Sequence, residues 1–196
     1  MEATLRSHPV FRYVDDEQWD VFMRYVVREI YPKDSYFLQA GEVAEKIGFV
    51  QSGLFRGFYR NNKGVIFTKE FILERQILGC LSSIYRSVAS DYTYQAIEES
   101  EVWTFDYVVL STLALDHPVW ERVKRLIAEE AFLRSEEKQH NLQILSTKEN
   151  LEFFAKNSEI LKKRIPQFMI ASYFGVNPVT LSRIANQDEI KKKNKG

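Results

Sequence analysis

The longest uninterrupted helical pattern in this chain covers residues 119–145, which contain neither glycine nor proline. Because these two residues are the usual interruptions of a helix, the pattern predicts one long helix. Asp116 and Pro118 stand just ahead of it, where a cap residue and a first-turn proline belong. A helix of this length constrains the fold, because one small domain covers only part of its surface.

A heptad count places a partly apolar seam along one face of this helix. The seam positions are Val119, Val123, Leu126, Glu130, Leu133, Glu137, His140 and Ile144. Glutamates are costly in a dry coiled-coil seam, so two interpretations stay open: packing on the chain's own domain, or pairing with a second copy. We favour a homodimer. Its contact residues would be Val119, Val123, Leu126, Leu133 and Ile144.

The residues from about 35 to 106 form short runs rich in β-branched and aromatic side chains, with turn residues between them. The runs cover 35–40, 46–52, 54–60, 65–73, 92–97 and 101–105. Asn61 to Gly64 predicts a tight hairpin, since Asn and Gly tolerate the positive φ angles of such turns. Short strands at regular spacing predict an antiparallel sandwich or barrel.

An amphipathic helix is predicted ahead of the strands, over residues 15–31. Asp15 or Asp16 would cap it, and Pro32 would end it. Its apolar positions are Trp19, Phe22, Met23, Val26, Val27 and Ile30.

Beyond the long helix, Ser146 and Glu149 have the spacing of a capping box, in which each side chain satisfies the other's backbone amide. A helix is expected to follow. Its apolar positions are Leu151, Phe153, Phe154, Ile160 and Leu161.

The segment 165–187 predicts two short helices joined by a glycine turn. Pro166 suits the first position of the first helix, and Gly175 suits its left-handed end. Asn177 can cap a second helix, which Leu181 and Ile184 would anchor inward. The pattern predicts a helix-turn-helix; a plain helical hairpin with a solvated polar face is the alternative.

The outward face of the second helix has side chains that suit the major groove of DNA. Arg183 can bond guanine bidentately, and hydroxyl groups can bond phosphates or base edges. The candidate DNA-binding residues are Val179, Thr180, Ser182, Arg183, Asn186 and Gln167.

With these pieces in this order, the chain resembles the CRP/FNR family of bacterial transcription regulators. Residues 40–60 are similar to the family's early jelly-roll strands, with turn glycines at Gly41 and Gly53, and 101–105 to the last strand. The helix from Pro118 resembles the dimerisation helix, and 165–184 resembles the DNA-binding helix-turn-helix.

The resemblance implies an α+β protein of three parts. These are a cyclic-nucleotide-binding-like jelly-roll sensor at 1–116, a dimerisation helix at 117–145 and a helix-turn-helix domain at 146–196. It also implies a homodimer that binds double-stranded DNA at a palindromic operator, with half-sites about 34 Å apart. The alternative is a protein- or ligand-binding sensor module whose helix-turn-helix no longer binds DNA.

The chain departs from the cyclic-nucleotide-binding members at the phosphate cassette. Gly79 is present, but Cys80 replaces the ribose-binding glutamate, and Ser90 and Asp91 replace the phosphate-binding arginine and its partner. Asp91 would repel a phosphodiester, so cAMP is not the expected effector. An unknown small molecule or none is expected instead. The candidate pocket residues are Arg56, Lys69, Gly79, Cys80, Tyr92 and Tyr94.

Charge and composition bound the remaining possibilities. The 27 basic and 27 acidic side chains cancel, yet residues 1–145 carry a net charge of −5 and residues 146–196 carry +5. A basic half is what attraction to phosphates needs. A single cysteine and no membrane-length apolar run predict a cytoplasmic protein without membrane contact.

Enzymatic chemistry finds no support in the sequence. His8, His117 and His140 all lie outside the predicted strands, so a cupin-type metal site lacks its usual ligands. Cys80 alone cannot hold an iron–sulfur cluster. We therefore expect no catalytic residue, no metal and no cofactor.

Overall fold

The computed structural model describes residues 2–146, 148–150 and 163–183. The chain divides into two compact units. The first contains Met1–Tyr59 and Glu70–Leu133, and the second contains Arg60–Lys69 and Arg134–Gly196. A short stretch of the β region therefore groups with the C-terminal part of the chain.

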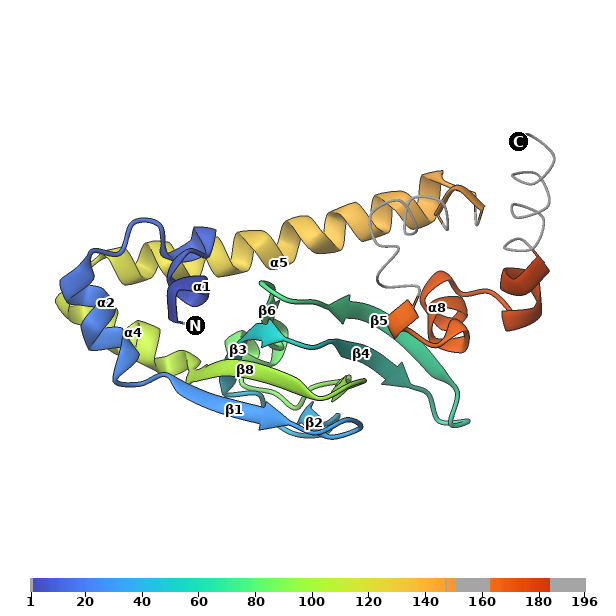
Figure 1. Ribbon diagram of the computed structural model, residues 1–196, viewed down its shortest axis with the longest axis horizontal. Helices are drawn as coiled ribbons and strands as arrows, with labels where there is room; N and C mark the ends of the chain where they lie inside the picture. Colours follow the sequence, from blue (N-terminus) through green and yellow to red (C-terminus); the bar gives the residue numbers. More distant parts are fainter. Residues whose placement is uncertain (1, 147, 151–162, 184–196) are drawn as a thin grey trace. The chain divides into compact units, whose positions relative to one another are not determined.

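Two four-stranded sheets, each with antiparallel pairing, form the β region (Figure 1). The first has the order β1 (Val27–Tyr31), β8 (Ser100–Asp106), β3 (Lys46–Ser52) and β6 (Ile77–Leu78). The second has the order β2 (Tyr36–Leu38), β7 (Thr93–Ala96), β4 (Phe55–Arg60) and β5 (Ile66–Ile72). Five of the six predicted runs contain one of these strands and the sixth, 101–105, lies within β8, as their β-branched and aromatic composition indicated.

Several helices surround the first sheet. They are α1 (Glu2–Arg6), the 3-10 turn η1 (Pro9–Phe11), α2 (Asp16–Met23), α3 (Leu81–Arg86), α4 (Tyr107–Asp116) and α5 (Val119–Ile144). An aromatic core joins them to the sheet: the ring of Phe22 lies 5.0 Å from that of Phe105 and 5.1 Å from that of Trp120. Trp120 is fully buried, and its indole N–H donates to the Gln18 side chain at 3.1 Å. The sequence analysis did not predict α4 or the short α1 and α3.

The predicted helix over 15–31 is wrong in its second half. Asp15 caps α2 by accepting from the Gln18 amide at 2.8 Å, but the helix ends at Met23. Val26 lies between the elements, and Val27 and Ile30 belong to β1. β1 pairs with β8, where the Arg28 guanidinium donates two bonds of 2.7 Å to Glu101. Pairing across more than 70 residues overrode the local helical spacing.

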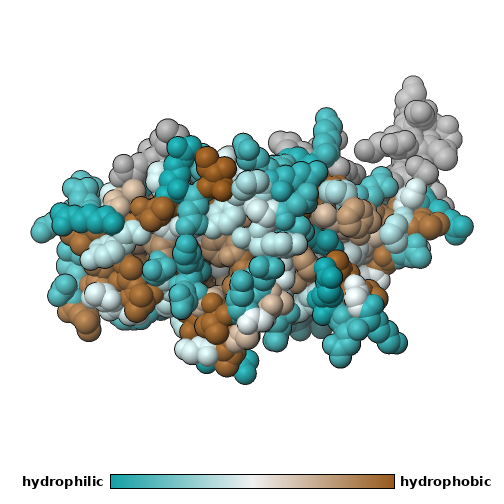
Figure 2. Space-filling view, turned by 90° about the horizontal axis from the view of Figure 1, so that it is seen from below, coloured by the Kyte–Doolittle hydropathy of each residue, from teal (hydrophilic) through white to brown (hydrophobic). Residues whose placement is uncertain are grey.

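The long helix is confirmed as α5, and its two halves differ. Trp120, Val123 and Ile127 are buried in the core of their own unit. Val123 is therefore no part of an exposed seam, and Val119 and Leu126 are partly buried against the same core. The second half exposes Phe132, Leu133 and Ile144. The view in Figure 2 shows the molecule from the side away from α5; there, hydrophobic groups are separated by hydrophilic ones.

The predicted hairpin is confirmed at the start of the second unit. The Asn61 amide donates to the Val65 carbonyl at 3.0 Å, and the Asn61 side chain accepts from the amides of Lys63 and Val65 at 3.0 Å each. Gly64 has φ +79°, the left-handed geometry that such a turn needs.

Side-chain hydrogen bonds join the base of this hairpin to α8 (Gln167–Phe174). The Ser172 hydroxyl accepts from the Thr68 amide and donates to the Ile66 carbonyl, each at 2.9 Å. The Thr68 hydroxyl in turn donates to the Met169 carbonyl at 3.2 Å. Lys138 of α5 donates to the Lys69 carbonyl. These bonds make the hairpin a part of the second unit.

The predicted capping box is confirmed as well. The Ser146 amide donates to the Glu149 carboxylate at 2.9 Å, and the Glu149 amide donates to the Ser146 hydroxyl at 3.3 Å. The apolar positions expected to follow it, from Leu151 to Leu161, lie outside the described residues. Among the helices that the structure describes, none has the length and apolar content to cross a membrane.

Candidate nucleic-acid interface and effector pocket

A glycine turn joins α8 to a second short helix over residues 178–183. The sequence analysis placed Pro166 at the first position of this helix, which is wrong by one residue: Pro166 has an extended conformation with ψ 137°, and α8 begins at Gln167. Gly175 ends α8 with φ +66°, as predicted, because a residue with a Cβ is strained there. The Asn177 side chain accepts from the Val179 amide at 2.8 Å and so caps the second helix, also as predicted.

The second helix has one inward and one outward face. Leu181 is 4% exposed, which confirms it as the inward anchor, whereas Val179 is 58% exposed. Thr180 and Arg183 are also exposed, and Ser182 is half-buried. The structure thus presents the predicted side chains on one short helix.

Three other predicted positions belong to this helix pair. Gln167 is exposed at the start of α8. Ile184, expected to point inward, and Asn186, expected to face DNA, lie outside the described residues.

The two structural units differ more in net charge than the sequence segments 1–145 and 146–196 do. Residues 60–69 and 134–196 have 15 basic and 7 acidic side chains, a net charge of +8. The first unit has 12 basic and 20 acidic side chains, a net charge of −8. The increase comes from the hairpin, whose ten residues contain three basic side chains and no acidic one.

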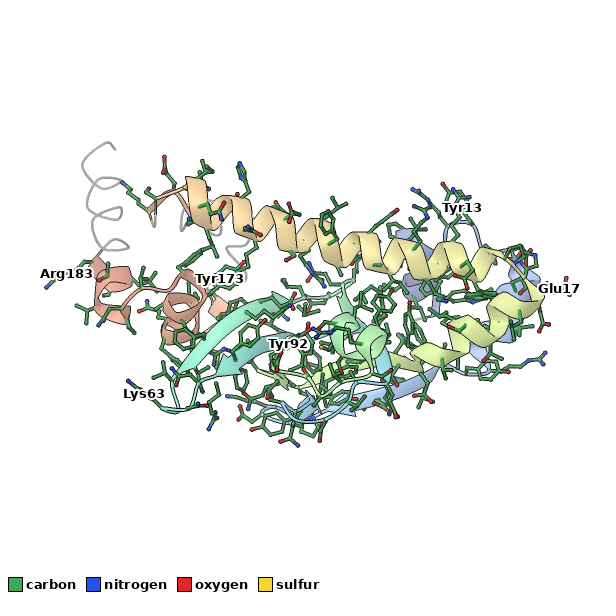
Figure 3. The ribbon with its side chains drawn as sticks, turned by 180° about the vertical axis from the view of Figure 1, so that it is seen from behind. Tyr13, Glu17, Lys63, Tyr92, Tyr173 and Arg183 are labelled. Carbon is green, nitrogen blue, oxygen red and sulfur yellow. The ribbon has the colours of Figure 1, made fainter. Side chains whose placement is uncertain are left out.

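Four of the six predicted pocket residues lie together in the first unit. Cys80 is fully buried, and the Ser90 hydroxyl donates to its sulfur at 3.5 Å. Tyr92 lies in the β region (Figure 3), and its ring meets that of Tyr94 edge to face with centroids 5.3 Å apart. The Tyr94 hydroxyl is 2.7 Å from the Glu70 carboxylate and 3.4 Å from the Gly79 carbonyl.

The polar groups around Cys80 are largely shielded from solvent. Burial raises the pKa of the Cys80 thiol, but hydrogen bonds from Ser82, Ser90 and Tyr92 outweigh burial and leave that pKa below its ordinary value. Burial, followed by the hydrogen bond to Cys80, raises the pKa of Tyr92. The groups around Cys80 are thus packed aromatic rings and side chains that bond one another.

The other two predicted pocket residues are placed differently. Arg56 on β4 is 3% exposed, its guanidinium lies 5.2 Å from the centre of the Phe58 ring, and burial lowers its pKa to about 10. Lys69 belongs to the second unit, where its carbonyl accepts from Lys138.

A cavity of about 740 Å³ opens elsewhere in the first unit. Tyr85, Tyr107 and Lys124 line it, and the two tyrosine hydroxyls are hydrogen-bonded at 2.8 Å. None of the predicted pocket residues lines this cavity. Sequence reasoning missed it because it adjoins α4, which was not predicted.

Among the described residues, no group of three or more His, Cys, Asp and Glu side chains is arranged so that it could hold a metal ion.

No protein-family model matches the chain, and no curated protein sequence matches it. Solved structures do. FixK2 from Bradyrhizobium japonicum superposes with a TM-score of 0.73 at 17% identity, over 85% of this chain and 86% of that one.

Two further structures match over most of both chains. A protein from Eubacterium rectale, named as a transcriptional regulator of the crp/fnr family, gives a TM-score of 0.73 at 13% identity, over 93% and 87% of the two chains. CLP from Xanthomonas campestris, named as a c-di-GMP responsive global regulator, gives 0.72 at 13% identity, over 91% and 93%.

The chain has the CRP/FNR fold. The resemblance inferred from the sequence is thereby confirmed, as is the combination of antiparallel sheets and helices. At these identities the likeness concerns the fold, and the roles of individual side chains are a separate matter.

Proposed function

We propose that this chain is a dimeric, sequence-specific DNA-binding transcription regulator of the CRP/FNR type. One observation carries the proposal: the helix pair 167–183 turns at Gly175, buries Leu181 and exposes Arg183 on a unit of net charge +8. An inward anchor and an outward polar face on a second helix are what a helix-turn-helix needs. The names of the structures that share the CRP/FNR fold support the same function.

Each exposed side chain has a role in this proposal. Arg183 bonds the O6 and N7 atoms of a guanine, and Val179 packs on a base edge. Ser182 reads a base edge, and Thr180 bonds a phosphate. Gln167, at the start of α8, is placed to bond the sugar–phosphate backbone.

Dimerisation uses the exposed half of α5 in this proposal. Leu133 and Ile144 are exposed by 64% and 68% in the single chain, whereas apolar positions in the first half are buried in their own unit. Two copies related by a two-fold axis would cover these side chains and read a palindromic site.

The sensor part is proposed to be a cyclic-nucleotide-binding-like jelly roll that does not use cAMP. The buried Cys80 and its partners Ser90 and Tyr92 support this, since they bond one another. Asp91, exposed beside them, adds repulsion toward a phosphodiester. The effector is an unknown small molecule, or there is none.

Selection of binding sites from a random duplex library, followed by mobility-shift titration, tests this function. The wild-type chain should select a palindromic site, and Arg183→Ala should weaken binding to that site by about 5- to 150-fold, the cost of one lost bidentate contact. Lys33→Ala, at an exposed position of the first unit, serves as control and should bind normally. Weak, equal binding to every sequence would contradict the proposal and favour a binding module without DNA specificity.

A further inference from the structure

We propose that the hairpin tip formed by residues 60–65 is a second phosphate-binding element, which contacts the DNA backbone beside the site read by the 178–183 helix. The inference rests on the proposed function and adds a contact outside the helix-turn-helix. Its ligand is the phosphodiester backbone of duplex DNA, and its ligating groups are the side chains of Arg60 and Lys63.

The base of the hairpin is fixed to the helix pair. Ser172, on α8, bonds both the carbonyl of Ile66 and the amide of Thr68. The Thr68 hydroxyl adds a bond to the Met169 carbonyl one helical turn earlier. Because the same α8 leads through Gly175 into the 178–183 helix, the hairpin and the recognition helix belong to one body.

The tip itself is exposed and held in shape. All of the residues 60–65 are exposed, and the Asn61 side chain binds two backbone amides across the turn. Because these bonds already fix the turn, binding a ligand costs little further ordering of the backbone. A preformed, exposed turn is a suitable carrier for charges that must meet fixed phosphates.

The charges of the tip are available. Within the part of the chain that the structure describes, the side chains of Arg60 and Lys63 form no ion pair, and no acidic residue occurs between 60 and 69. By contrast, exposed cations of the first unit such as Arg28 and Lys46 are paired with carboxylates. Two unpaired cations and two asparagine amides are groups that bind phosphate oxygens.

The reach of the hairpin suits contact with a single DNA duplex. Gly64 lies four positions before Thr68, so an extended chain places the tip at most about 13 Å beyond the Ser172 contact. Figure 3 shows Lys63 and Arg183 at the same end of the molecule. B-DNA carries one charge per about 1.7 Å of its axis, so a cation displaced by this length still meets phosphates of neighbouring base pairs.

Salt dependence of DNA binding separates phosphate contacts from other effects. The double variant Arg60→Gln, Lys63→Gln changes exposed side chains only, so it leaves the fold intact. The measurement is a titration of the variant against the selected site of the wild type, in a duplex of about 40 base pairs and between about 50 and 200 mM salt. The slope of log K against log salt should become less steep by about 0.9 per lost contact, or about 1.8 in all. This change in slope corresponds to a loss of affinity of roughly 10- to 60-fold near 0.1 M salt.

Two matched variants sharpen this test. The double variant Arg60→Lys, Lys63→Arg keeps both charges and should keep the wild-type slope. The double variant Arg24→Gln, Lys33→Gln removes two exposed cations from the first unit and should also leave the slope unchanged.

The outcomes distinguish this inference from the function on which it rests. If the wild-type chain selects a site but the glutamine pair retains the wild-type slope, the hairpin inference is overturned and the proposed function stands. An equal loss in the first-unit control would also overturn it, because the effect would then be one of net charge alone. If the wild-type chain selects no site, both fail together.

Discussion

The two compact units differ in net charge and in the side chains that they bury. The first carries a net charge of −8 and a core in which aromatic rings from α2, β8 and α5 meet at about 5 Å. The second carries +8, buries the aliphatic side chains of Ile170 and Leu181, and has hydrogen bonds that join its hairpin to α8. The first unit therefore concentrates buried aromatic rings, while the second concentrates basic charge that a bound polyanion can neutralise.

The largest expected effect tests whether stability resides in the aromatic core of the first unit. Trp120→Ala removes a fully buried ring and leaves the Gln18 carbonyl without its donor, so it should lower the free energy of unfolding by about 3–5 kcal/mol. Urea denaturation followed by circular dichroism measures this change. Leu115→Ala, at an 86% exposed position of α4, is the control and should cost under about 0.5 kcal/mol. If Trp120→Ala lowered the free energy of unfolding as little as the control does, the aromatic core would not be the source of stability in the first unit.

The next effect concerns the division along α5. Leu133→Glu places a charge in the proposed contact twice per dimer, so the dissociation constant should rise by at least about 100-fold, or 2.7 kcal/mol. Sedimentation equilibrium provides the measurement. Leu115→Glu changes an 86% exposed leucine on α4 and should leave the dimer intact. Equal behaviour of the two variants would show that the exposed half of α5 is not the contact.

A smaller effect addresses the hydrogen bonds that organise the second unit. Ser172→Ala removes the hydroxyl that bonds the Ile66 carbonyl and the Thr68 amide, at a cost of about 1–2 kcal/mol. Hydrogen exchange at the Thr68 amide should therefore become about 10-fold faster. The Val65 amide, bonded to Asn61, should exchange as before. Unchanged exchange at Thr68 would mean that the hairpin does not depend on α8.

The smallest effect is a pH dependence confined to the first unit. Burial lowers the pKa of His8, and the nearby Glu130 carboxylate opposes this only in part. The unfolded chain therefore takes up the proton first, and the stability contributed by neutral His8 is lost as pH falls below about 6.5, with a slope of at most about 1.4 kcal/mol per pH unit.

His8→Phe keeps a ring against Phe49 and removes the titrating group. Urea denaturation at about pH 7.5 and about pH 5.5 should then show a smaller difference in stability for the variant than for the wild type. An identical difference in both proteins would assign the pH dependence to other groups.

The sequence predicted those elements whose signals are local. The runs that became strands are rich in β-branched and aromatic residues, and Gly64, Gly175 and Asn177 serve the turn and cap roles that their chemistry dictates. Leu181 is buried and Arg183 exposed as helical spacing required. These features follow from short-range sterics and periodicity, which one sequence carries.

Non-local contacts explain what the sequence did not predict. Val26, Val27 and Ile30 continue the apolar spacing of α2, yet pairing with β8 turns two of them into strand residues. α4 is apolar on several faces, so no helical period distinguishes it from the strand before it. Thr68 bonds Ser172 across 104 residues, and neither segment alone has a pattern that predicts this contact.

The Ser172 bonds have one more consequence, for solubility. β5 is the outermost strand of its sheet, and such strands offer a row of unpaired amides and carbonyls to any other extended chain. The serine hydroxyl occupies one donor and one acceptor of that row over residues 66–69. A shortened chain that lacks α8 would lose these two bonds, so α8 also protects this edge of the sheet against pairing with other chains and aggregation.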